Sequence, residues 1–390
     1  MANRIGPRLV MLGTRFETRG GVSSVVNVYR VGGLFERWPV TYIATHCDGG
    51  AVRKCFIGLK AAVQFLWLLT VGKVAAVHAH VASFSSFWRK SIFLLFAFAA
   101  RRPVIFHLHG GNFARFHEQS GPLKRSCIRF ILRHSAQVIV LSEQWKRLVA
   151  HIVPGLPLVT VPNPVSLPAL QNVPRRPAEL LFLGRMNRDK GIYDLLSVVA
   201  ALRRTHPGLR LVCAGDGEID RVKLRAAELG IAEAVHVAGW LRAVDRQHHL
   251  SQCTALVLPS YVEGLPMCVL EAMAAGTAVV ATPVGGIPLA VAHGAEGLLV
   301  APGDLEALKN ALNLLLSRPQ LAHEMGVHGR RKIERRFAAE IVIPQIEALY
   351  RAVGLAPMGA GAGRSRAIAG AALHFSAAAG QRFFLRRRAR

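Results

Sequence analysis

The chain has 390 residues, 52% hydrophobic and 18% charged, a composition that excludes a disordered or fibrous protein and fits two globular domains of ordinary size. Its formal net charge of +26 at pH 7 favours anionic partners such as nucleic acids, acidic lipid headgroups or diphosphate-bearing substrates. Six cysteines occur without a Cys-x-x-Cys pair or a ligand-like histidine spacing, so the sequence predicts neither a zinc site nor a disulfide framework, and reduced thiols are expected.

The positive charge is concentrated in the first part of the chain and at its end. Residues 1–162 carry 21 Lys and Arg against 5 Asp and Glu, residues 163–363 carry 21 against 18, and residues 364–390 carry seven arginines and no acid. An arginine-rich genomic composition would raise the charge everywhere and does not explain the nearly neutral middle. We therefore expect the first part of the chain and the tail to face anions.

The sequence shows no export signal and no spanning segment. No apolar core of signal-peptide length precedes the first predicted strand, and the most apolar runs, such as residues 91–100, are shorter than the ~20 residues that cross a bilayer. We therefore expect a cytoplasmic chain that is neither exported nor membrane-spanning.

Strand-like and helix-like segments alternate along the chain, which predicts an α/β architecture with parallel sheets. The first strand is predicted at residues 8–13, and the loop after it ends in Gly20 and Gly21, before a helix that begins at residue 22 or 23. Two glycines at a helix start let backbone amides approach a phosphate, although such a pair more often marks only a turn.

Further strands are predicted at residues 38–45, 74–79, 103–108, 137–141 and 158–161. Two of them end in histidine pairs at alternate positions, His78 with His80 and His107 with His109. Each pair lies on one face at the carboxyl end of its strand, where open α/β sheets bind ligands. A metal site is the less favoured use, because no carboxylate or thiolate accompanies the histidines.

Residues 82–102 form a predicted helix with aromatic bulk in its body and basic residues at both ends. A buried amphipathic helix is the simpler interpretation, and a helix on a membrane surface is the alternative. Residues 161–177 follow later, contain repeated prolines and have no helical period, so they predict a linker.

A basic loop follows the first strand of the second part, at residues 179–183. Gly184, Arg185 and Lys190 belong to the sequence GRMNRDKG, after which a helix begins at Ile192. A guanidinium and an ammonium at a strand-to-helix turn can both reach a diphosphate. The strand at residues 209–214 leads into a second loop of this kind, which contains Gly215.

Two acids lie eight residues apart in the stretch 260–276. Glu263 falls in a loop after a buried strand, and Glu271 falls on a helix that ends at Gly276. The amides at the helix start favour a phosphate, and the carboxylates accept hydrogen bonds from sugar hydroxyls. In isolation such a spacing more often marks solvated surface charges. Whether the two acids bind a ligand therefore depends on the surrounding residues.

The last helices are predicted at residues 304–317, 319–336 and 340–352. The tail after Gly354 is rich in Ala, Gly, Ser and Arg and is too poor in apolar residues to build a core. We expect it to be disordered when free, or to lie on an anionic membrane.

The run EGLPMCVLEAMAAGTAVVAT, together with LGRMNRDKG, AGDGE and TPVGGIP, resembles the retaining GT-B glycosyltransferases called family 4 or group 1. The resemblance covers residues 8–352 and is most specific in the second half. It implies two Rossmann-like domains whose parallel sheets face a central cleft. It also implies these parts: an acceptor domain at 1–162, a linker at 163–178, a nucleotide-sugar domain at 179–340, a crossover helix at 341–353 and a basic tail at 354–390.

The resemblance also implies roles for particular residues. Arg185 and Lys190 would clamp the donor phosphates in place of a metal, Glu271 would hold the ribose and Glu263 the sugar hydroxyls. His109 would border the donor sugar as a fourth catalytic residue beside Glu263, Arg185 and Lys190, and His80 would face the acceptor. The implied donor-binding set is Gly20, Gly21, Gly184, Arg185, Lys190, Gly215, Glu263, Gly264, Leu265, Pro266 and Glu271. Asn163 matches the family hinge, but Pro164 replaces the glycine that follows it, which leaves a ligand role of Asn163 open.

The implied reaction moves a hexosyl group from a UDP- or GDP-sugar to an acceptor, without a cofactor or metal. The acceptor would be polyprenyl-diphosphate-linked or another glycan of surface polysaccharide biosynthesis, and the enzyme would lie peripherally on the inner face of the membrane. A GT-B sugar-nucleotide epimerase is one alternative. A nicotinamide oxidoreductase would need a Gly-x-Gly-x-x-Gly loop that the sequence lacks. A nucleic-acid-binding protein would explain the charge but not the acidic pair, so we expect no nucleic-acid partner.

Overall fold

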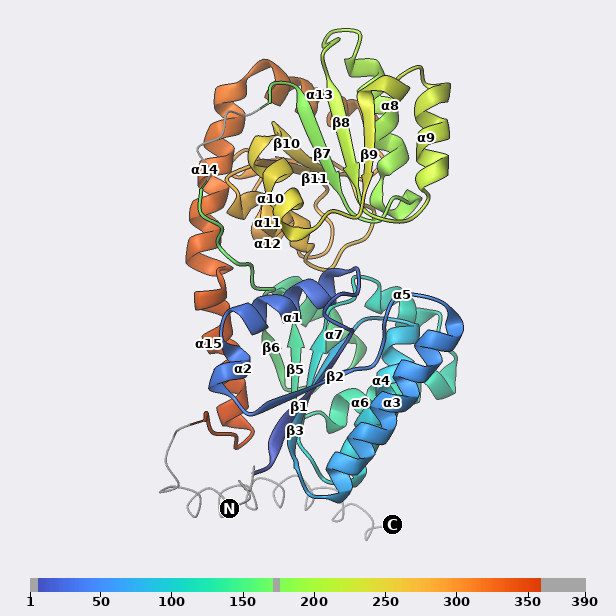
Figure 1. Cartoon of the computed structure of the whole chain (residues 1–390), viewed down its shortest axis with the longest axis vertical. Coiled ribbons are helices and arrows are strands. Elements are labelled where there is room, and N and C mark those ends of the chain that lie inside the picture. Colours follow the sequence, from blue (N-terminus) through green and yellow to red (C-terminus); the bar gives the residue numbers. More distant parts are fainter. Residues whose placement is uncertain (1–5, 171–175, 359–390) are drawn as a thin grey trace, which may run out of the picture.

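The computed structural model describes residues 6–170 and 176–358, which form two lobes stacked on each other (Figure 1). Each lobe contains one parallel six-stranded sheet with helices on both faces. The strand orders are β2-β1-β3-β4-β5-β6 and β12-β11-β10-β7-β8-β9. Helices on both faces explain why the strand sequences are almost continuously apolar.

The first lobe contains the strands β1 (Arg8–Gly13), β2 (Val40–Ala44), β3 (Val74–Val81), β4 (Val104–Leu108), β5 (Gln137–Val140) and β6 (Leu158–Thr160). Its helices are α1 (Gly21–Val31), α2 (Leu34–Arg37), α3 (Ala51–Thr70), α4 (Ser85–Ala99), α5 (Phe113–Glu118), α6 (Pro122–His134) and α7 (Glu143–Ile152). The predicted strands are therefore confirmed, with shifted ends. Strands β2 and β4 begin one residue after a proline, Pro39 and Pro103, because proline has no N–H to donate to the ladder.

The second lobe contains the strands β7 (Glu179–Leu183), β8 (Arg210–Ala214), β9 (Val235–Gly239), β10 (Ala255–Leu258), β11 (Ala278–Ala281) and β12 (Gly297–Leu299). Its helices are α8 (Ile192–Leu202), α9 (Ile219–Glu228), α10 (Ala243–Gln252), α11 (Met267–Ala274), α12 (Ile287–Ala290), α13 (Leu305–Ser317) and α14 (Pro319–Arg336). Short 3-10 turns lie at Arg188–Lys190 and Ala232–Ala234. Helix α15 (Ala339–Ala352) follows α14.

Each sheet has one point where the chain reverses its direction of travel across the strands. In the first sheet β1 and β3 are neighbours, and in the second sheet β7 and β10 are neighbours. In open parallel sheets the loops at the carboxyl ends of such strands diverge and leave a crevice for ligands. The loops after β1, β3, β7 and β10 are those that carry the glycine pair, His80, the Arg185–Lys190 segment and Glu263.

Helix α15 packs against the first lobe, although α14 before it packs on the second (Figure 1). The hydroxyl of Tyr350 lies 2.8 Å from Nδ1 of His78, and Nε of Arg37 donates to Oε1 of Glu347 at 2.7 Å. The Tyr350 ring also meets Trp38 edge-on. These contacts join helix α15, which follows the second-lobe helix α14, to the core of the first lobe.

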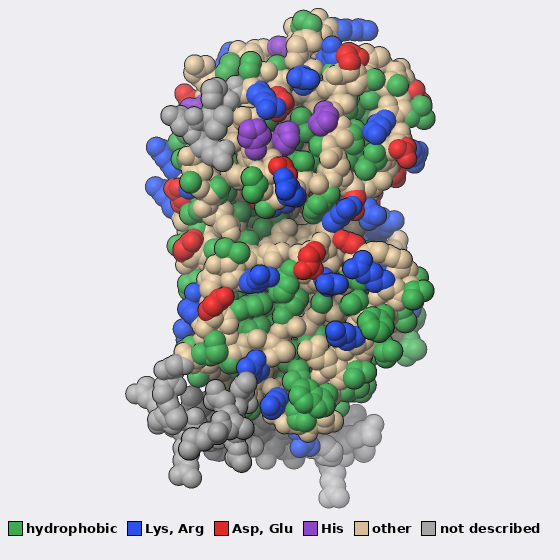
Figure 2. Space-filling model, in the orientation of Figure 1, with side chains coloured by type: hydrophobic (Ala, Val, Ile, Leu, Met, Phe, Trp, Pro, Cys, Tyr) green, Lys and Arg blue, Asp and Glu red, His purple; other side chains and the backbone are tan. Residues whose placement is uncertain are grey.

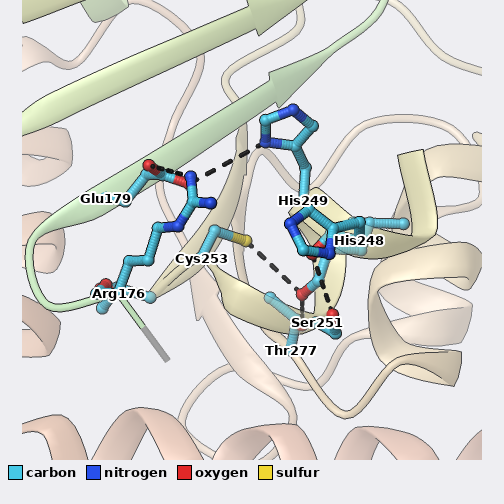
Figure 3. A network of polar contacts seen from close by, with 9 residues as sticks. Arg176, Glu179, His248, His249, Ser251, Cys253 and Thr277 are labelled. Carbon is cyan, nitrogen blue, oxygen red and sulfur yellow. Dashed lines mark hydrogen bonds and ion pairs between the residues drawn. The ribbon is translucent and has the colours of Figure 1, made fainter. Parts of the chain in front are cut away.

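The linker rejoins the second lobe through a polar network at the start of β7 (Figure 3). The backbone N–H of Arg176 donates to the carbonyl of Gln252 at 2.7 Å, and its guanidinium donates to Glu179 at 3.3 Å. Nδ1 of His249 lies 4.0 Å from the same carboxylate. The network lies at the amino end of β7, and ligands bind at the opposite end, so it anchors the linker and takes no part in the site.

No helix in the described ranges 6–170 and 176–358 is long and apolar enough to cross a membrane. Most of the predicted basic tail, residues 359–390, lies outside the described residues.

Candidate active site

A cavity of about 340 Å³ lies between the lobes, at the carboxyl ends of both sheets. The first lobe contributes the loop after β1 and the start of α1, and the second lobe contributes the loops after β7, β8 and β10. Nine of the residues singled out from the sequence line this cavity: Gly20, Gly21, Gly184, Arg185, Lys190, Gly215, Glu263, Pro266 and Glu271. Segments up to 250 residues apart in sequence therefore meet at one place.

Two glycines keep the floor of the cavity free of side chains. Gly215 has φ of +147°, and a Cβ atom there would lie 1.8 Å from the carbonyl oxygen of Gly184. No L-residue fits such a backbone contact. The loops after β7 and β8 can therefore approach each other closely, and they present backbone to a ligand.

Lys190 and Glu263 form an ion pair of 2.5 Å across the cavity wall. The hydroxyl of Ser260 also donates to Glu263, at 2.8 Å, and the Glu263 side chain is 7% exposed. Lys190 was predicted to bind the phosphates and Glu263 the sugar hydroxyls, and in this structure the two side chains neutralise each other. Arg185 forms no ion pair with any described residue and is exposed, so it presents the free positive charge of this wall.

Glu271 is paired with Arg246 of α10, whose Nε lies 3.1 Å from its carboxylate. Burial raises the pKa of Glu271, and the charge of Arg246 opposes that rise. The sequence analysis missed Arg246, because α10 reads as an ordinary polar surface helix. It also missed Arg19, whose guanidinium lies 5.8 Å from the Trp240 ring centre and joins the lobes beside the cavity. The sequence did offer a signal for Arg19, because this basic residue directly precedes Gly20 in the predicted phosphate-binding loop.

The four histidines form one cluster, in which His78, His80 and His107 are buried and His109 is partly exposed. Nε2 of His78 lies 3.2 Å from Nδ1 of His107, and Nδ1 of His80 lies 2.8 Å from Nε2 of His109. Burial, with the charge of Lys90 adding to it, lowers the pKa of His109 to about 3, so the ring is neutral at physiological pH. Nitrogens of His78, His80 and His107 lie within 4.8 Å of one another, but both nitrogens of His78 already have hydrogen-bond partners. Nε2 of His80, Nε2 of His107 and Nδ1 of His109 have no hydrogen-bond partner among the described residues.

His80 is fully buried beneath His109 and does not reach the cleft. The role of His80 on the acceptor side stays a prediction. His109, directly after β4, is the more exposed of the two histidines. His80 is placed to orient the His109 ring.

Close backbone packing joins the His109 loop to the Glu263 loop. A Cβ atom on Gly264 would lie 2.6 Å from the carbonyl oxygen of His109, and one on Gly111 would lie 2.4 Å from the carbonyl of Glu263. Leu265 is buried, and its carbonyl accepts a hydrogen bond of 2.8 Å from Asn163. Gly264 and Leu265 thus hold the acidic loop in place rather than line the cavity.

The arrangement suits a ligand with a diphosphate and several hydroxyl groups. Helix α1 begins at the cavity without a side-chain cap, so its free amides face the ligand space beside Arg185 and Lys190. Fixed positive charge and amides stabilise phosphate oxygens, and the two carboxylates accept hydrogen bonds from hydroxyls.

Two family models match the chain. The model described as glycosyl transferases group 1 matches residues 168–332, and the model described as a glycosyl transferase 4-like domain matches residues 12–164. Together they span both lobes.

Curated relatives match mainly over part of their length. Glycogen synthase of Mycobacterium tuberculosis is 31% identical over 230 residues, which are 57% of this chain and 56% of the relative. Alpha-maltose-1-phosphate synthase of Mycolicibacterium smegmatis is 39% identical over 44% of this chain and 47% of the relative. D-inositol 3-phosphate glycosyltransferase of Corynebacterium jeikeium is 37% identical over 40% of this chain and 39% of the relative. The chain spans about half the length of these relatives.

Solved structures match over nearly the whole chain. Sucrose-phosphate synthase of Thermosynechococcus elongatus superposes with a TM-score of 0.75 at 21% identity and covers 89% of this chain and 99% of its own. HepE of Anabaena, determined in complex with UDP-glucose, superposes with a TM-score of 0.71 at 17% identity. The match covers 88% of this chain and 99% of HepE. At these identities the likeness establishes the fold.

Proposed function

Because the chain belongs to the group 1 glycosyl transferases and has their GT-B fold, we propose that it transfers a hexosyl group from a nucleoside diphosphate sugar to an acceptor hydroxyl, with retention of anomeric configuration. One observation carries this proposal. The cavity between the lobes brings Arg185, Lys190 and the start of α1 together with Glu263 and Glu271. This combination matches the phosphates and hydroxyls of such a donor.

The proposed chemistry depends on positive charge at the diphosphate. Cleavage of the anomeric bond leaves positive charge on the sugar ring and negative charge on the departing diphosphate, and fixed cations that face the diphosphate stabilise this charge separation. Arg185 and Lys190 supply these cations, and the amides of α1 add partial positive charge. Glu263 holds Lys190 in place through its ion pair.

The carboxylates bind hydroxyl groups in this proposal. Glu271 accepts hydrogen bonds from the ribose, and Glu263 accepts them from the transferred sugar, beside His109. The pair does not act as the nucleophile and acid of a glycosidase, because Glu263 and Glu271 are each engaged with a cation. The β-phosphate of the donor takes the proton of the acceptor hydroxyl.

The donor can be identified by a screen with the isolated protein. HepE was determined with UDP-glucose, which makes UDP-sugars the first donors to try and GDP-sugars the second. Release of the nucleoside diphosphate is followed with and without a polyprenyl-diphosphate-linked sugar. Transfer that needs the acceptor supports the proposal, whereas an altered sugar nucleotide from the donor alone would indicate an epimerase.

Glu271→Ala should raise the donor KM about 10- to 150-fold, because loss of a charged hydrogen-bond acceptor costs about 1.5 to 3 kcal/mol. The matched control is Glu228→Ala, which removes the exposed partner of Arg225 from the surface of α9. Steady-state kinetics over a range of donor concentrations measures the difference. An unchanged donor KM in Glu271→Ala would remove the ribose role.

The proposed acceptor is lipid-linked, and helix α3 supports this part of the proposal. Val52, Phe56, Leu59, Val63 and Trp67 recur at helical spacing, and each is more than half exposed. Figure 2 shows hydrophobic side chains gathered over the lower lobe, where Figure 1 places α3. An apolar stripe of this size on a soluble surface marks an interaction site.

Helix α4 extends the same surface, and its surroundings are basic. Ile92, Leu95 and Phe96 of α4 are exposed, and α4 packs beside α3. Residues 49–117, which include both helices, hold nine Lys and Arg and no Asp or Glu. Apolar side chains within a purely basic region match an anionic membrane surface better than another protein. The chain therefore works peripherally on the inner face of the membrane in this proposal, with the basic tail as a second contact.

The protein should co-sediment with vesicles that contain anionic lipid and much less with neutral vesicles. Each basic side chain near the surface contributes about 1 kcal/mol, and salt near 1 M, where the Debye length is about 3 Å, should release most of the protein. Leu59→Glu should weaken binding, and Leu224→Glu on α9 should not, although the two leucines are 63% and 62% exposed. Deleting residues 355–390 should also weaken binding without abolishing transfer to a soluble acceptor analogue. Equal loss in both leucine variants would exclude α3 as the membrane contact.

A further inference from the structure

The start of helix α4 lies beside the candidate active site and lacks the usual cap. Its N-cap residue is Phe84, which offers no side-chain hydrogen bond and has φ of 56°. The first amides of a helix have no partners within the helix and carry partial positive charge. Because α4 follows β3, this positive end faces the cleft between the lobes.

A buried lysine lies one turn further along α4. Lys90 is 1% exposed, and no carboxylate among residues 6–170 and 176–358 forms an ion pair with it. Its ammonium donates one hydrogen bond of 3.0 Å, to the hydroxyl of Ser86. A lysine on a helix leans toward the helix start, so the ammonium lies over the first turn of α4. Burial, with the charge of Arg89 adding to it, lowers the pKa of Lys90 to about 7, and a bound anion would favour the charged form of this side chain.

Two residues near Lys90 in sequence have buried polar atoms without a partner. The buried Oγ atom of Ser83 and the buried Nε atom of Arg89 have no hydrogen-bond partner in the part of the chain that the structure describes. The hydroxyl of Ser86 accepts hydrogen bonds from the Ala82 N–H and from Lys90, so its own hydrogen is free to donate. The guanidinium N–H of Arg89 can only donate and the Ser83 hydroxyl can donate, so both can bind an anion.

These donors adjoin the proposed transfer site. A Cβ atom on Gly110 would lie 2.8 Å from the Ser83 hydroxyl, and the next residue, Gly111, touches the Glu263 loop. Burial first, and then the charge of Lys90, lower the pKa of His109. The exposed apolar face of α3 and α4 belongs to the same lobe.

We propose that the start of α4 binds a phosphate or diphosphate group of the acceptor through Lys90, Arg89, Ser83, Ser86 and the first amides of the helix. This inference rests on the proposed function and assigns the acceptor to one chemical class. The anion would lie on the first-lobe side of His109, opposite the Arg185 and Lys190 wall that faces the donor. An acceptor anchored in this way presents its sugar hydroxyl toward the cavity and its lipid toward α3 and α4.

Titration of the full chain with inorganic pyrophosphate, in the presence of saturating UDP, tests the site by calorimetry. UDP fills the donor phosphate region, so any further pyrophosphate binding reports a second site. Lys90→Met should weaken this binding at least tenfold, Lys90→Arg should keep it within about threefold, because it keeps the cation, and UDP affinity should not change in either. Lys223→Met, which removes an exposed lysine of α9, is the control and should bind both ligands like the wild type.

Thermal unfolding separates a binding role from a structural one. Removal of an unpaired buried charge should leave the Tm of Lys90→Met equal to or above that of the wild type. Wild-type affinity for pyrophosphate in Lys90→Met, or no pyrophosphate binding by the UDP-loaded wild type, would overturn the inference. Failure of UDP to bind would instead contradict the proposed function. In that case pyrophosphate titration of the Arg185→Ala, Lys190→Ala protein still decides whether α4 holds an anion.

Farnesyl diphosphate and farnesol then distinguish an acceptor site from a site for free phosphate. Under the same conditions the diphosphate should bind at least as tightly as pyrophosphate and depend on Lys90, and farnesol should show no dependence on Lys90. Exclusion of farnesyl diphosphate by a site that binds pyrophosphate would overturn the assignment to the acceptor.

Discussion

Replacing Arg185 and Lys190 together by alanine should lower kcat by about a thousandfold or more, because removal of a single preorganised group that stabilises developing negative charge already costs about 10²- to 10³-fold. The structure adds a second reason. Lys190 is the ion-pair partner of the buried Glu263, so its removal leaves that carboxylate without its cation at the place where a diphosphate would lie. Initial rates of nucleoside diphosphate release at saturating donor measure the effect.

Arg188→Ala is the control for this double variant. Arg188 belongs to the same loop and is exposed, but it does not line the cavity. Its replacement should leave kcat within about twofold, in line with the small effects of surface substitutions. A double variant that keeps a tenth of the wild-type kcat would show that the cations do not carry the phosphate charge.

Chelation gives an independent test of the same clamp. If Arg185 and Lys190 neutralise the diphosphate, EDTA should have little effect on the wild-type rate. Strict dependence on added Mg²⁺ or Mn²⁺ would contradict a clamp that works without metal.

Gly111→Ala should lower kcat about a hundredfold, because a displacement of about 1 Å at a reacting centre can cost that much. The new methyl carbon would lie 2.4 Å from the carbonyl carbon and oxygen of Glu263, and neither backbone can yield without moving one lobe against the other. The Tm should fall as well, because the contact between the two loops is part of the interface between the lobes. Kinetics and thermal unfolding of the variant measure the two effects.

Gly208→Ala is the control for Gly111→Ala, because a Cβ atom at Gly208 meets nothing within 4 Å. It should change neither kcat nor Tm appreciably. If Gly111→Ala has the kcat of the wild type, the His109 and Glu263 loops are not in contact during turnover, and the site would have to work in a more open arrangement of the lobes.

The secondary structure and many residues that line the cavity could be predicted from the sequence, because local pattern determines both. Apolar runs bounded by glycine and proline located the strands, and proline positions account for the shifted starts of β2 and β4. Parallel strands place the loops at their carboxyl ends on one edge. Glycines and charged residues directly after predicted strands, such as Gly184, Arg185 and Glu263, were therefore expected to meet, and they do.

Tertiary structure alone decided which charges are paired and which are buried. Arg246 and Lys190 pair with acids that lie 25 and 73 residues away along the chain. The sequence alone does not reveal that these segments are in contact. His80 and His109 look equivalent in sequence, but His80 is fully buried within β3, whereas His109, directly after β4, is partly exposed. From the sequence, Lys90 is only one of the basic residues near the start of a predicted helix, whereas the packing of α4 buries it, and no acid of the described residues forms an ion pair with it. The face that α3 exposes was equally undetermined, because that helix is apolar on nearly all sides and only its contact with the sheet leaves Phe56, Leu59 and Trp67 outside.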